Sequence, residues 1–339
     1  MAITIKDVAR EAGVATSTVS RVISNSNKIS EETKQKVKAA INKLNYTPNI
    51  IARGLANNKT RILAVVLPEV AENLFENPFF IKAMKGISIC AQKEGYYIMY
   101  AFKEEGSRDS HWVNKFTESN IVDGLCLFNA KDNDESIEYL KKIGKNFVVI
   151  GRPDEADTML WVDNDNFKAM ESLVERFIEK GHRNIAFIGA NKNLNVSKDR
   201  LSGYKQALKT ASLNIDEEQI VEGEDFTEDV GYRSTLKILE NNRPTAIVTT
   251  DDLIAFGVQR ALNDKGITDI AIASFNNIPL ANYQVPALAS VDINAEKLGY
   301  CATKLLIDKL EGRELTKRYG IIETKLIERE SMNIIIKEK

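Results

Sequence analysis

No apolar run in this 339-residue chain approaches the ~18 residues that a membrane-spanning helix needs. The first residues, MAITIKDVAR, also lack the apolar core of a secretory signal. These two absences argue against a membrane protein and against a secreted one. We therefore expect a cytoplasmic protein that has no membrane partner.

Cysteine and histidine are scarce. Cys90, Cys126 and Cys301 lie far apart in apolar surroundings, and an odd, scattered set does not make a disulfide framework or a zinc site. We expect three buried thiols. The two histidines, His111 and His182, are also far apart in the sequence. No metal and no cofactor are expected.

Sequence motifs of common enzymes are missing as well. The chain has no phosphate-binding P-loop, no dinucleotide-binding glycine pattern and no nucleophile elbow. We therefore expect no catalytic residues and no enzyme. The acidic stretch at residues 163–165 leaves three possibilities open, namely a cation site, a set of acceptors for ligand hydroxyls, or solvated acids.

Charge is distributed unevenly along the chain. Residues 1–60 hold ten Lys and Arg and four acidic residues, which gives this segment a charge of +6. The remainder holds 36 basic and 44 acidic residues, or −8. A basic head on an acidic body suggests that the head binds a polyanion, although a solvated surface is the alternative.

The basic segment has the pattern of three short helices. Thr4 can cap the first helix, and Gly13 ends it. A second helix is expected over residues 15–23, and Ser30 can cap a third. Two short helices around a glycine-containing turn, supported by a third helix, are typical of a helix-turn-helix.

In that motif the N-terminal end of the second helix meets base edges in the DNA major groove. The polar side of the expected second helix carries Thr16, Ser17, Ser20 and Arg21. An arginine can bond guanine through two hydrogen bonds, which is worth ~1–3 kcal/mol of base discrimination. A packing module without a ligand is the alternative, and the charge of +6 argues against it.

Residues 4–24 (TIKDVAREAGVATSTVSRVIS) and 29–56 (ISEETKQKVKAAINKLNYTPNIIARGLA) resemble the DNA-binding head of the LacI/GalR family of bacterial transcription regulators. The resemblance implies that Thr16, Ser17 and Arg21 read bases and that the Thr16-Ser17 pair sets operator preference. The DNA-binding residues that it implies are Thr4, Thr16, Ser17, Thr18, Ser20, Arg21, Asn27, Tyr46, Asn49, Ala52, Arg53 and Leu55.

Residues 48–56 resemble the hinge helix of that family. The segment is short and contains Gly54, so it should be marginally stable as an isolated helix. This suits a segment that folds only on binding. The resemblance implies that two such helices enter the minor groove, where Leu55 of each wedges into a base step. The alternative is that Leu55 packs on the body as a linker residue.

From residue 61 onward, short apolar runs alternate with amphipathic segments. Strands are expected over residues 62–67, 97–101, 125–128, 147–150, 185–188, 246–249 and 270–274. Helices are expected over residues 80–94, 166–180, 202–211, 232–240 and 253–265. This alternation indicates parallel sheets with helices on both faces. The segment is long enough for two similar lobes with a ligand between them.

Residues 77–80, 121–124, 181–186, 200–204 and 286–291 resemble the core that follows the head in this family. The implied fold is an all-α helix-turn-helix head plus an α/β body of two doubly wound parallel-sheet lobes of the periplasmic-binding-protein-like type. The expected domains are a head (1–46), a hinge helix and linker (47–60), and an effector-binding and dimerisation core (61–339). Its N-lobe spans about 61–160 and 291–321, its C-lobe spans about 161–290 and 322–339, and the crossings lie near Leu160, Ser290 and Ile322.

The expected effector is a sugar, whose adjacent hydroxyls suit a forked guanidinium and whose apolar faces suit aromatic rings. The resemblance implies that Arg200 is the effector arginine. Asn276 departs from the Asp of many relatives, which removes a charge and leaves an amide that donates and accepts. The effector-binding residues we expect are Phe79, Phe80, Trp161, Asp165, Arg200, Phe226, Asp251 and Asn276. Core packing is the alternative for each aromatic residue.

Residues 77–80 and 274–277 look most like the maltose-repressor branch of the family. The resemblance implies a homodimeric repressor that binds double-stranded operator DNA and responds allosterically to a small sugar, maltose or a maltodextrin. Whether the sugar induces or co-represses stays open. The alternative is a pleiotropic carbon-catabolite regulator whose corepressor is a phosphorylated carrier protein. An enzyme or a transport component is a third possibility, against which the head argues. No heptad repeat ends the chain, so we expect a dimer and no tetramer.

Overall fold

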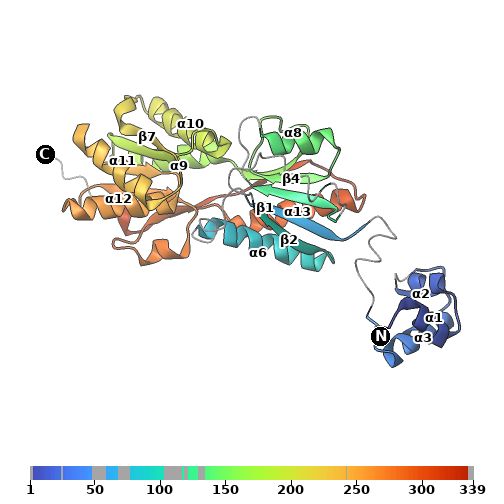
Figure 1. Ribbon diagram of the computed structural model, residues 1–339. Coiled ribbons are helices and arrows are strands. Elements are labelled where there is room, and N and C mark those ends of the chain that lie inside the picture. The colour runs from blue at the N-terminus through green and yellow to red at the C-terminus, as the bar shows by residue number, and fades with distance from the viewer. Residues whose placement is uncertain are drawn as a thin grey trace. The chain divides into compact units, whose positions relative to one another are not determined.

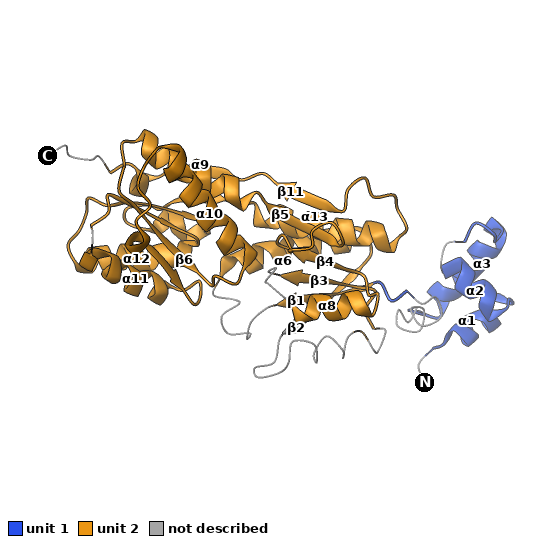
Figure 2. Ribbon diagram, turned by 90° about the horizontal axis from the view of Figure 1, so that it is seen from above, with its two compact units in different colours: residues 1–61 blue, residues 62–339 orange. Residues whose placement is uncertain are grey.

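The computed structural model describes residues 3–23, 26–47, 59–67, 77–102, 117, 121–128, 134–241 and 243–334. The chain divides into two compact units, residues 1–61 and residues 62–339 (Figure 2). Each unit has a hydrophobic core of its own. No helix in the described ranges is long and apolar enough to cross a membrane.

The first unit contains three helices, α1 (Ile5–Ala12), α2 (Thr16–Ile23) and α3 (Glu31–Lys43). The Asp7 carboxylate accepts hydrogen bonds from the backbone nitrogen and hydroxyl of Thr4, which caps α1. Gly13 ends α1 with a φ of 65°, in the left-handed region that favours glycine. Val8, Val19 and Val37 are fully buried between the helices. The predicted helix-turn-helix with a supporting helix is confirmed.

The first lobe of the second unit is a six-stranded parallel sheet of strand order β11-β5-β4-β3-β1-β2. The strands are β1 (Ile62–Leu67), β2 (Tyr97–Phe102), β3 (Gly124–Phe128), β4 (Phe147–Ile150), β5 (Leu160–Asn164) and β11 (Tyr319–Ile322). Helices α6 (Pro78–Lys93) and α13 (Ala295–Leu310) cover one face, and α8 (Glu135–Lys142) covers the other (Figure 1). Both faces are buried, because Leu63 and Val65 pack on one side of β1 while Ala64 and Val66 pack on the other.

The second lobe has the same layered architecture, with strand order β12-β10-β9-β8-β6-β7. Its strands are β6 (Ile185–Ala190), β7 (Ile220–Gly223), β8 (Ala246–Thr249), β9 (Ala271–Phe275), β10 (Ala289–Asp292) and β12 (Lys325–Ile327). Only β12 runs antiparallel to its neighbour, β10. The helices are α9 (Asn166–Glu179) and α10 (Asn195–Thr210) on one face, and α11 (Glu228–Asn241) and α12 (Asp252–Asp264) on the other. The predicted fold class is confirmed.

The chain crosses between the lobes three times. The crossings follow β5, β10 and β11, and each joins an element of one sheet to an element of the other lobe. The first crossing comes after Asn164, four residues later than we expected near Leu160. The physical reason is that β5 pairs with β4 and β11, so residues 160–164 belong to the first lobe.

Candidate functional site: a helix-turn-helix face and an interlobe cavity

One face of α2 carries the residues predicted to read bases. Thr16, Ser17, Ser20 and Arg21 are exposed, whereas Val19 and Val22 are buried against the other helices. The i, i+4 spacing places Thr16 with Ser20 and Ser17 with Arg21 on the same side of the helix. The polar face of α2 is therefore exposed to solvent.

The other predicted DNA-binding residues are placed less uniformly. Thr4 is bonded to Asp7 at the start of α1, and Asn27 is exposed after α2. Thr18 is half-buried, and so is Tyr46, which packs against the core of the unit. Four predicted residues lie outside the described residues, namely Asn49, Ala52, Arg53 and Leu55.

A cavity of about 280 Å³ lies between the two lobes of the second unit. Sites for small molecules usually span ~300–1,000 Å³, so this one lies just below that range. Both lobes contribute to the lining, which combines aromatic rings with amide, carboxylate and guanidinium groups. This combination is suited to a small polar molecule that also has apolar faces.

Arg200 lies on α10 and is 4% exposed. Its Nε and Nη2 donate to Asn166 Oδ1 at 3.1 and 2.9 Å, and its Nη1 donates to Thr250 O at 2.6 Å. The guanidinium carbon lies 4.1 Å from the centre of the Phe275 ring. Burial lowers the pKa of Arg200 to about 10, which still leaves it charged at neutral pH. A guanidinium has five N–H groups, so two remain for a ligand.

Asp251 connects the lobes at the cavity wall. Its Oδ1 caps α12 by accepting the Leu253 backbone N–H at 2.8 Å. Its Oδ2 accepts from Asn276 Nδ2 at 2.6 Å and from Asn77 Nδ2 at 3.3 Å, and Asn77 belongs to the first lobe. Burial raises the pKa of Asp251 to about 6. Asn276 has a φ of 97°, a strained conformation for a residue with a side chain and one that is often found at functional sites.

Aromatic rings form the apolar part of the lining. Phe79 and Phe80 stand edge to face with centroids 5.1 Å apart, and both also contact the Phe128 ring. Phe80 is buried in the core of the first lobe, whereas Phe79 is half-buried. Phe226 reaches the cavity from the second lobe and is half-buried as well.

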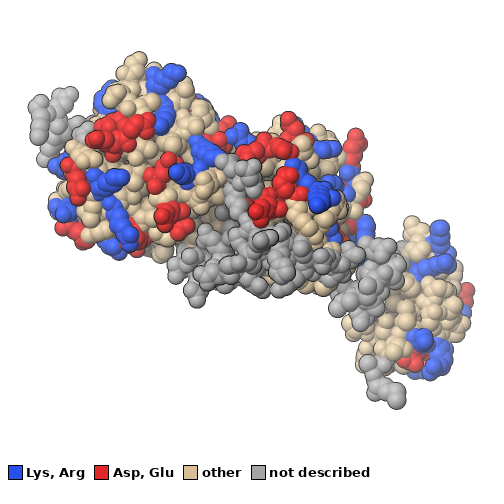
Figure 3. All heavy atoms as spheres, turned by 45° about the horizontal axis from the view of Figure 1, so that its top comes forward, with Lys and Arg blue, Asp and Glu red and all other residues tan. Residues whose placement is uncertain are grey.

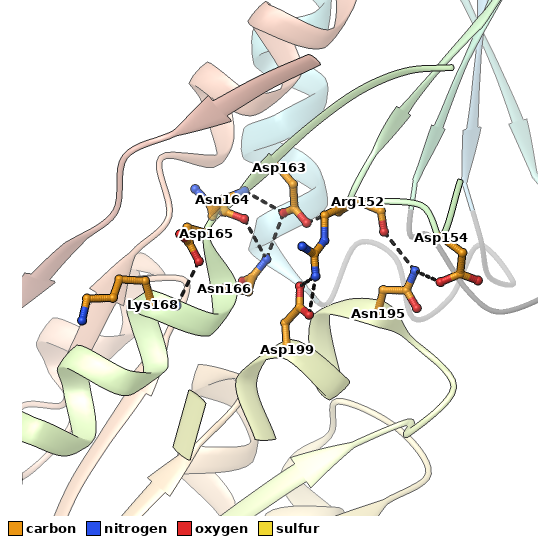
Figure 4. A network of polar contacts seen from close by, with 9 residues as sticks. All are labelled: Arg152, Asp154, Asp163, Asn164, Asp165, Asn166, Lys168, Asn195 and Asp199. Atoms are coloured by element: carbon orange, nitrogen blue, oxygen red, sulfur yellow. Dashed lines mark hydrogen bonds and ion pairs between the residues drawn. The ribbon is translucent and has the colours of Figure 1, made fainter. Parts of the chain in front are cut away.

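Polar contacts also join the lobes beside the cavity (Figure 4). Arg152, which follows β4, donates to both carboxylate oxygens of Asp199 on α10, at 2.6 and 2.8 Å. The amide of Asn195 donates to Arg152 O at 3.0 Å and to Asp154 Oδ1 at 2.9 Å. At a separate point, Lys82 Nζ on α6 of the first lobe donates to Asn277 O, which follows β9 of the second lobe, at 2.8 Å. These bonds hold the two lobes against each other.

The structure brings most of the predicted effector residues together. Six of them line this one cavity, namely Phe79, Phe80, Arg200, Phe226, Asp251 and Asn276. The other two predicted residues, Trp161 and Asp165, do not line this cavity. Trp161 stacks on Tyr319, with ring centroids 5.1 Å apart, and donates its indole N–H to Ala156 O. Asp165 caps α9 by accepting the Lys168 backbone N–H at 2.9 Å.

The lining also includes polar residues that were not among the expected effector-binding set, such as Asn77, Arg152, Asp163, Asn166 and Asn195. Asp163 belongs to the acidic stretch that the sequence left open as acceptors for ligand hydroxyls, and it lies at the carboxyl end of a buried strand, as Asp251 follows β8. It accepts backbone bonds from Asn164 and Arg152. Burial raises the pKa of Asp163. Among the described residues, no group of three or more His, Cys, Asp or Glu is arranged to hold a metal ion.

Comparison with known proteins places the chain among bacterial regulators. Residues 4–49 match the family described as bacterial regulatory proteins, lacI family, and residues 174–332 match a periplasmic binding protein-like domain. The HTH-type transcriptional regulator MalR of Streptococcus pneumoniae serotype 4 is 35% identical over 333 residues, which cover 97% of this chain and 100% of that regulator.

Two further similarities matter for the site. Catabolite control protein A of Priestia megaterium is 33% identical over 313 residues, which cover 90% of this chain and 92% of that protein. The solved structure of a complex of the transcriptional regulator CelR with cellobiose matches with a TM-score of 0.77 and 29% identity, and covers 97% of this chain and 99% of that one. These relatives are regulators and not enzymes, which agrees with the expectation from the sequence. The chain belongs to the lacI family of bacterial regulatory proteins and is a DNA-binding transcriptional regulator.

Proposed function

We propose that the protein is a repressor whose affinity for operator DNA is set by a small, uncharged sugar in the interlobe cavity, and that this sugar is maltose or a short maltodextrin. One observation carries the proposal: a buried arginine with two uncommitted N–H groups faces a cavity that also presents aromatic rings. Such a guanidinium suits adjacent hydroxyls, and the rings suit the apolar face of a pyranose.

The charges of the lining favour an uncharged ligand. Four carboxyl groups line the cavity, those of Asp163, Asp225, Glu228 and Asp251, against the two guanidinium groups of Arg152 and Arg200. A sugar phosphate would bring further negative charge into this acidic surrounding. The small volume favours a mono- or disaccharide over a long glucan. Similarity to a MalR protein and to a CelR–cellobiose complex supports a glucose-based disaccharide.

On the DNA side, we propose that Thr16, Ser17 and Arg21 read bases in the major groove and that Leu55 wedges into the minor groove. The exposed polar face of α2 supports the first part. The remaining DNA-binding residues of the sequence prediction are proposed to contact bases or phosphates around them. Effector and operator would then be coupled reciprocally, so that each changes the affinity for the other by the same factor.

We further propose that the working form is a homodimer, since a two-fold protein reads a near-palindromic operator. The first lobe exposes large apolar side chains that a second copy could cover. Ile81 and Ile89 on α6 and Tyr97 on β2 are each more than 40% exposed. In the second lobe, Tyr283 is 76% exposed.

The proposal is tested by titration calorimetry of the full chain with maltose, maltotriose, glucose and glucose 6-phosphate. We expect maltose or maltotriose to bind and the phosphate to bind more weakly. Arg200→Ala should abolish maltose binding, and Arg200→Lys, which keeps the charge but loses the fork, should weaken it. Arg233→Ala, which removes an exposed arginine on α11, is the matched control and should bind as wild type does. Absence of binding by every sugar would contradict the proposal.

If no sugar binds, a second candidate is favoured, namely a regulator that uses a phosphorylated carrier protein as corepressor. The similarity to a catabolite control protein supports this candidate. Such a partner needs a basic patch on the body. On the face of the body in Figure 3, however, Lys and Arg side chains are interspersed with Asp and Glu. The phosphorylated carrier protein would be the next titrant.

A further inference from the structure

The three segments that cross between the lobes meet at one side chain. Asn164 ends β5 and is 5% exposed. Its Nδ2 donates to Ile293 O at 3.0 Å, in the crossing that follows β10, and to Ile322 O at 2.8 Å, at the start of the crossing that follows β11. Both hydrogens of one amide are thereby used. Asn164 thus joins the first crossing to the second and to the third.

A second asparagine connects this junction to Arg200, and Figure 4 shows its bonds to Asp163 and Asn164. Asn166 begins α9, and its Oδ1 accepts the two bonds from Arg200. Its Nδ2 donates to Asp163 Oδ1 at 3.0 Å and to Asn164 O at 3.4 Å. The same Asp163 oxygen accepts the backbone N–H of Asn164 at 2.7 Å. A short chain of hydrogen bonds therefore runs from the Arg200 guanidinium to Asn164.

We propose that Asn164 holds the lobe hinge in one geometry, and that Asn166 is the positioning residue that orients Arg200 and connects it to that hinge. Rotation of the lobes displaces the crossings relative to one another. Such a displacement would break bonds of a buried amide, which is unfavourable unless new partners replace them. The hinge therefore favours discrete lobe arrangements over a continuum of intermediate ones.

A ligand that engages the remaining N–H groups of Arg200 acts on the same guanidinium that Asn166 holds. Any shift of that guanidinium changes the bonds of Asn166 to Asp163 and Asn164, and so is transmitted to the hinge. This ligand-dependent part rests on the proposed effector site. The role of Asn164 in the hinge does not depend on the identity of any ligand.

The hinge role is tested without ligand, by hydrogen–deuterium exchange of the full chain. We expect Asn164→Ala to raise the exchange rate about tenfold at backbone amides of all three crossings together, since a single side chain joins them. Asn164→Asp keeps the size but offers no donor, and should do the same if the alanine variant folds poorly. Asn263→Ala, at an exposed position on α12, is the control. Faster exchange confined to β5, or absent from the crossings, would overturn the assignment.

The positioning role needs two further variants. Asn166→Ala removes the acceptor for Arg200, so we expect maltose affinity to fall about tenfold. Asn166→Asp keeps that acceptor but loses both donors. We therefore expect it to bind maltose nearly as wild type does, while backbone amides of residues 163–166 exchange faster. Equal maltose affinity of Asn166→Ala and wild type would overturn this role.

If maltose does not bind wild type, the maltose proposal fails. The link of Asn166 to the hinge is then tested by hydrogen–deuterium exchange without ligand. Asn166→Ala must then speed exchange at residues 163–166, where Asn166 holds the Asp163 carboxylate, and leave the other two crossings unchanged. No change at residues 163–166 would overturn its link to the hinge.

Discussion

Arg152 and Asp199 form an ion pair across the cleft, with one guanidinium nitrogen 2.6 and 2.8 Å from the two carboxylate oxygens. Arg152 follows a strand of the first lobe, and Asp199 lies on a helix of the second. The side chain of Arg152 is 50% exposed and that of Asp199 is 19% exposed. The pair is therefore accessible at the edge of the cavity and can break when the lobes separate.

Breaking this pair should make the cleft open more easily. Partly exposed pairs are worth ~0.2–1 kcal/mol, so Asp199→Asn and Arg152→Gln should each speed maltose dissociation by up to about fivefold. The double variant should dissociate no faster than the single ones, as a double-mutant cycle by stopped-flow would show. Glu217→Gln, which breaks an ion pair with Lys205 within the second lobe, is the control. Additive effects of the two substitutions would contradict the interlobe role.

The placement of Trp161 gives a second prediction. Trp161→Phe should leave maltose affinity unchanged within twofold, because the indole stacks on Tyr319 and does not line the cavity. Phe226→Ala should weaken maltose several-fold, because that ring does line it. Calorimetric titration of both variants checks the pair. A large loss of affinity in Trp161→Phe would show that the indole contacts the ligand after all.

The residues that sequence reasoning placed correctly have local signals or family motifs. Gly13 ends α1 and Ser30 caps α3 through interactions with neighbours in the sequence. The aromatic pair Phe79 and Phe80 follows a capping Asn77 and a proline at the start of α6. Such features were readable because the relevant partners lie within a few residues.

Other residues depend on partners that are distant in the sequence, and these could not be predicted. Trp161 is held by Tyr319, on the short strand β11, for which no strand was expected. The side chain of Asn164 bonds Ile293 O and Ile322 O, and both of these residues are more than a hundred positions away in the sequence. Asp165 differs from these residues, because its contact is local. Its side chain caps α9, and an acidic residue at this position fits a helix cap as well as a ligand-binding role.

If Arg21 reads bases, its replacement should reduce discrimination between operator and other DNA. Arg21→Ala should reduce the preference for operator over scrambled DNA roughly tenfold or more, while much of the nonspecific binding stays. Arg10→Ala removes the same charge from α1, where Arg10 is paired with Asp7, and should preserve the preference. Binding is measured by fluorescence anisotropy on an operator selected from random-sequence DNA. An unchanged preference in Arg21→Ala would remove this residue from the base-reading set.

Buried carboxyl groups predict a pH dependence of stability. Burial raises the pKa of Asp252 to about 7, although Ser290 Oγ and the Ile278 backbone N–H donate to it. The ordinary value is 3.8, so the folded state holds a proton that the unfolded state releases. This contribution to the free energy of unfolding is complete below about pH 4 and is lost as the pH rises toward 7.

Asp252→Asn cannot ionise, so its free energy of unfolding should fall less steeply over this range. The difference in slope is at most ~1.4 kcal/mol per pH unit for one proton. Urea unfolding of wild type and variant at a series of pH values measures it. Asp229→Asn, at an exposed position on α11, is the control and should leave the slope unchanged. Equal slopes for wild type and Asp252→Asn would show that Asp252 does not take up this proton.

We propose that a sugar in the interlobe cavity controls DNA binding by the head. The most direct test is the fluorescence anisotropy of a labelled, selected operator bound to the full chain and titrated with maltose, with Arg200→Ala in parallel. We expect maltose to change the operator affinity of wild type at least fivefold and to leave that of the variant unchanged, with a reciprocal change in maltose affinity. Operator affinity that is the same with and without saturating maltose would contradict it.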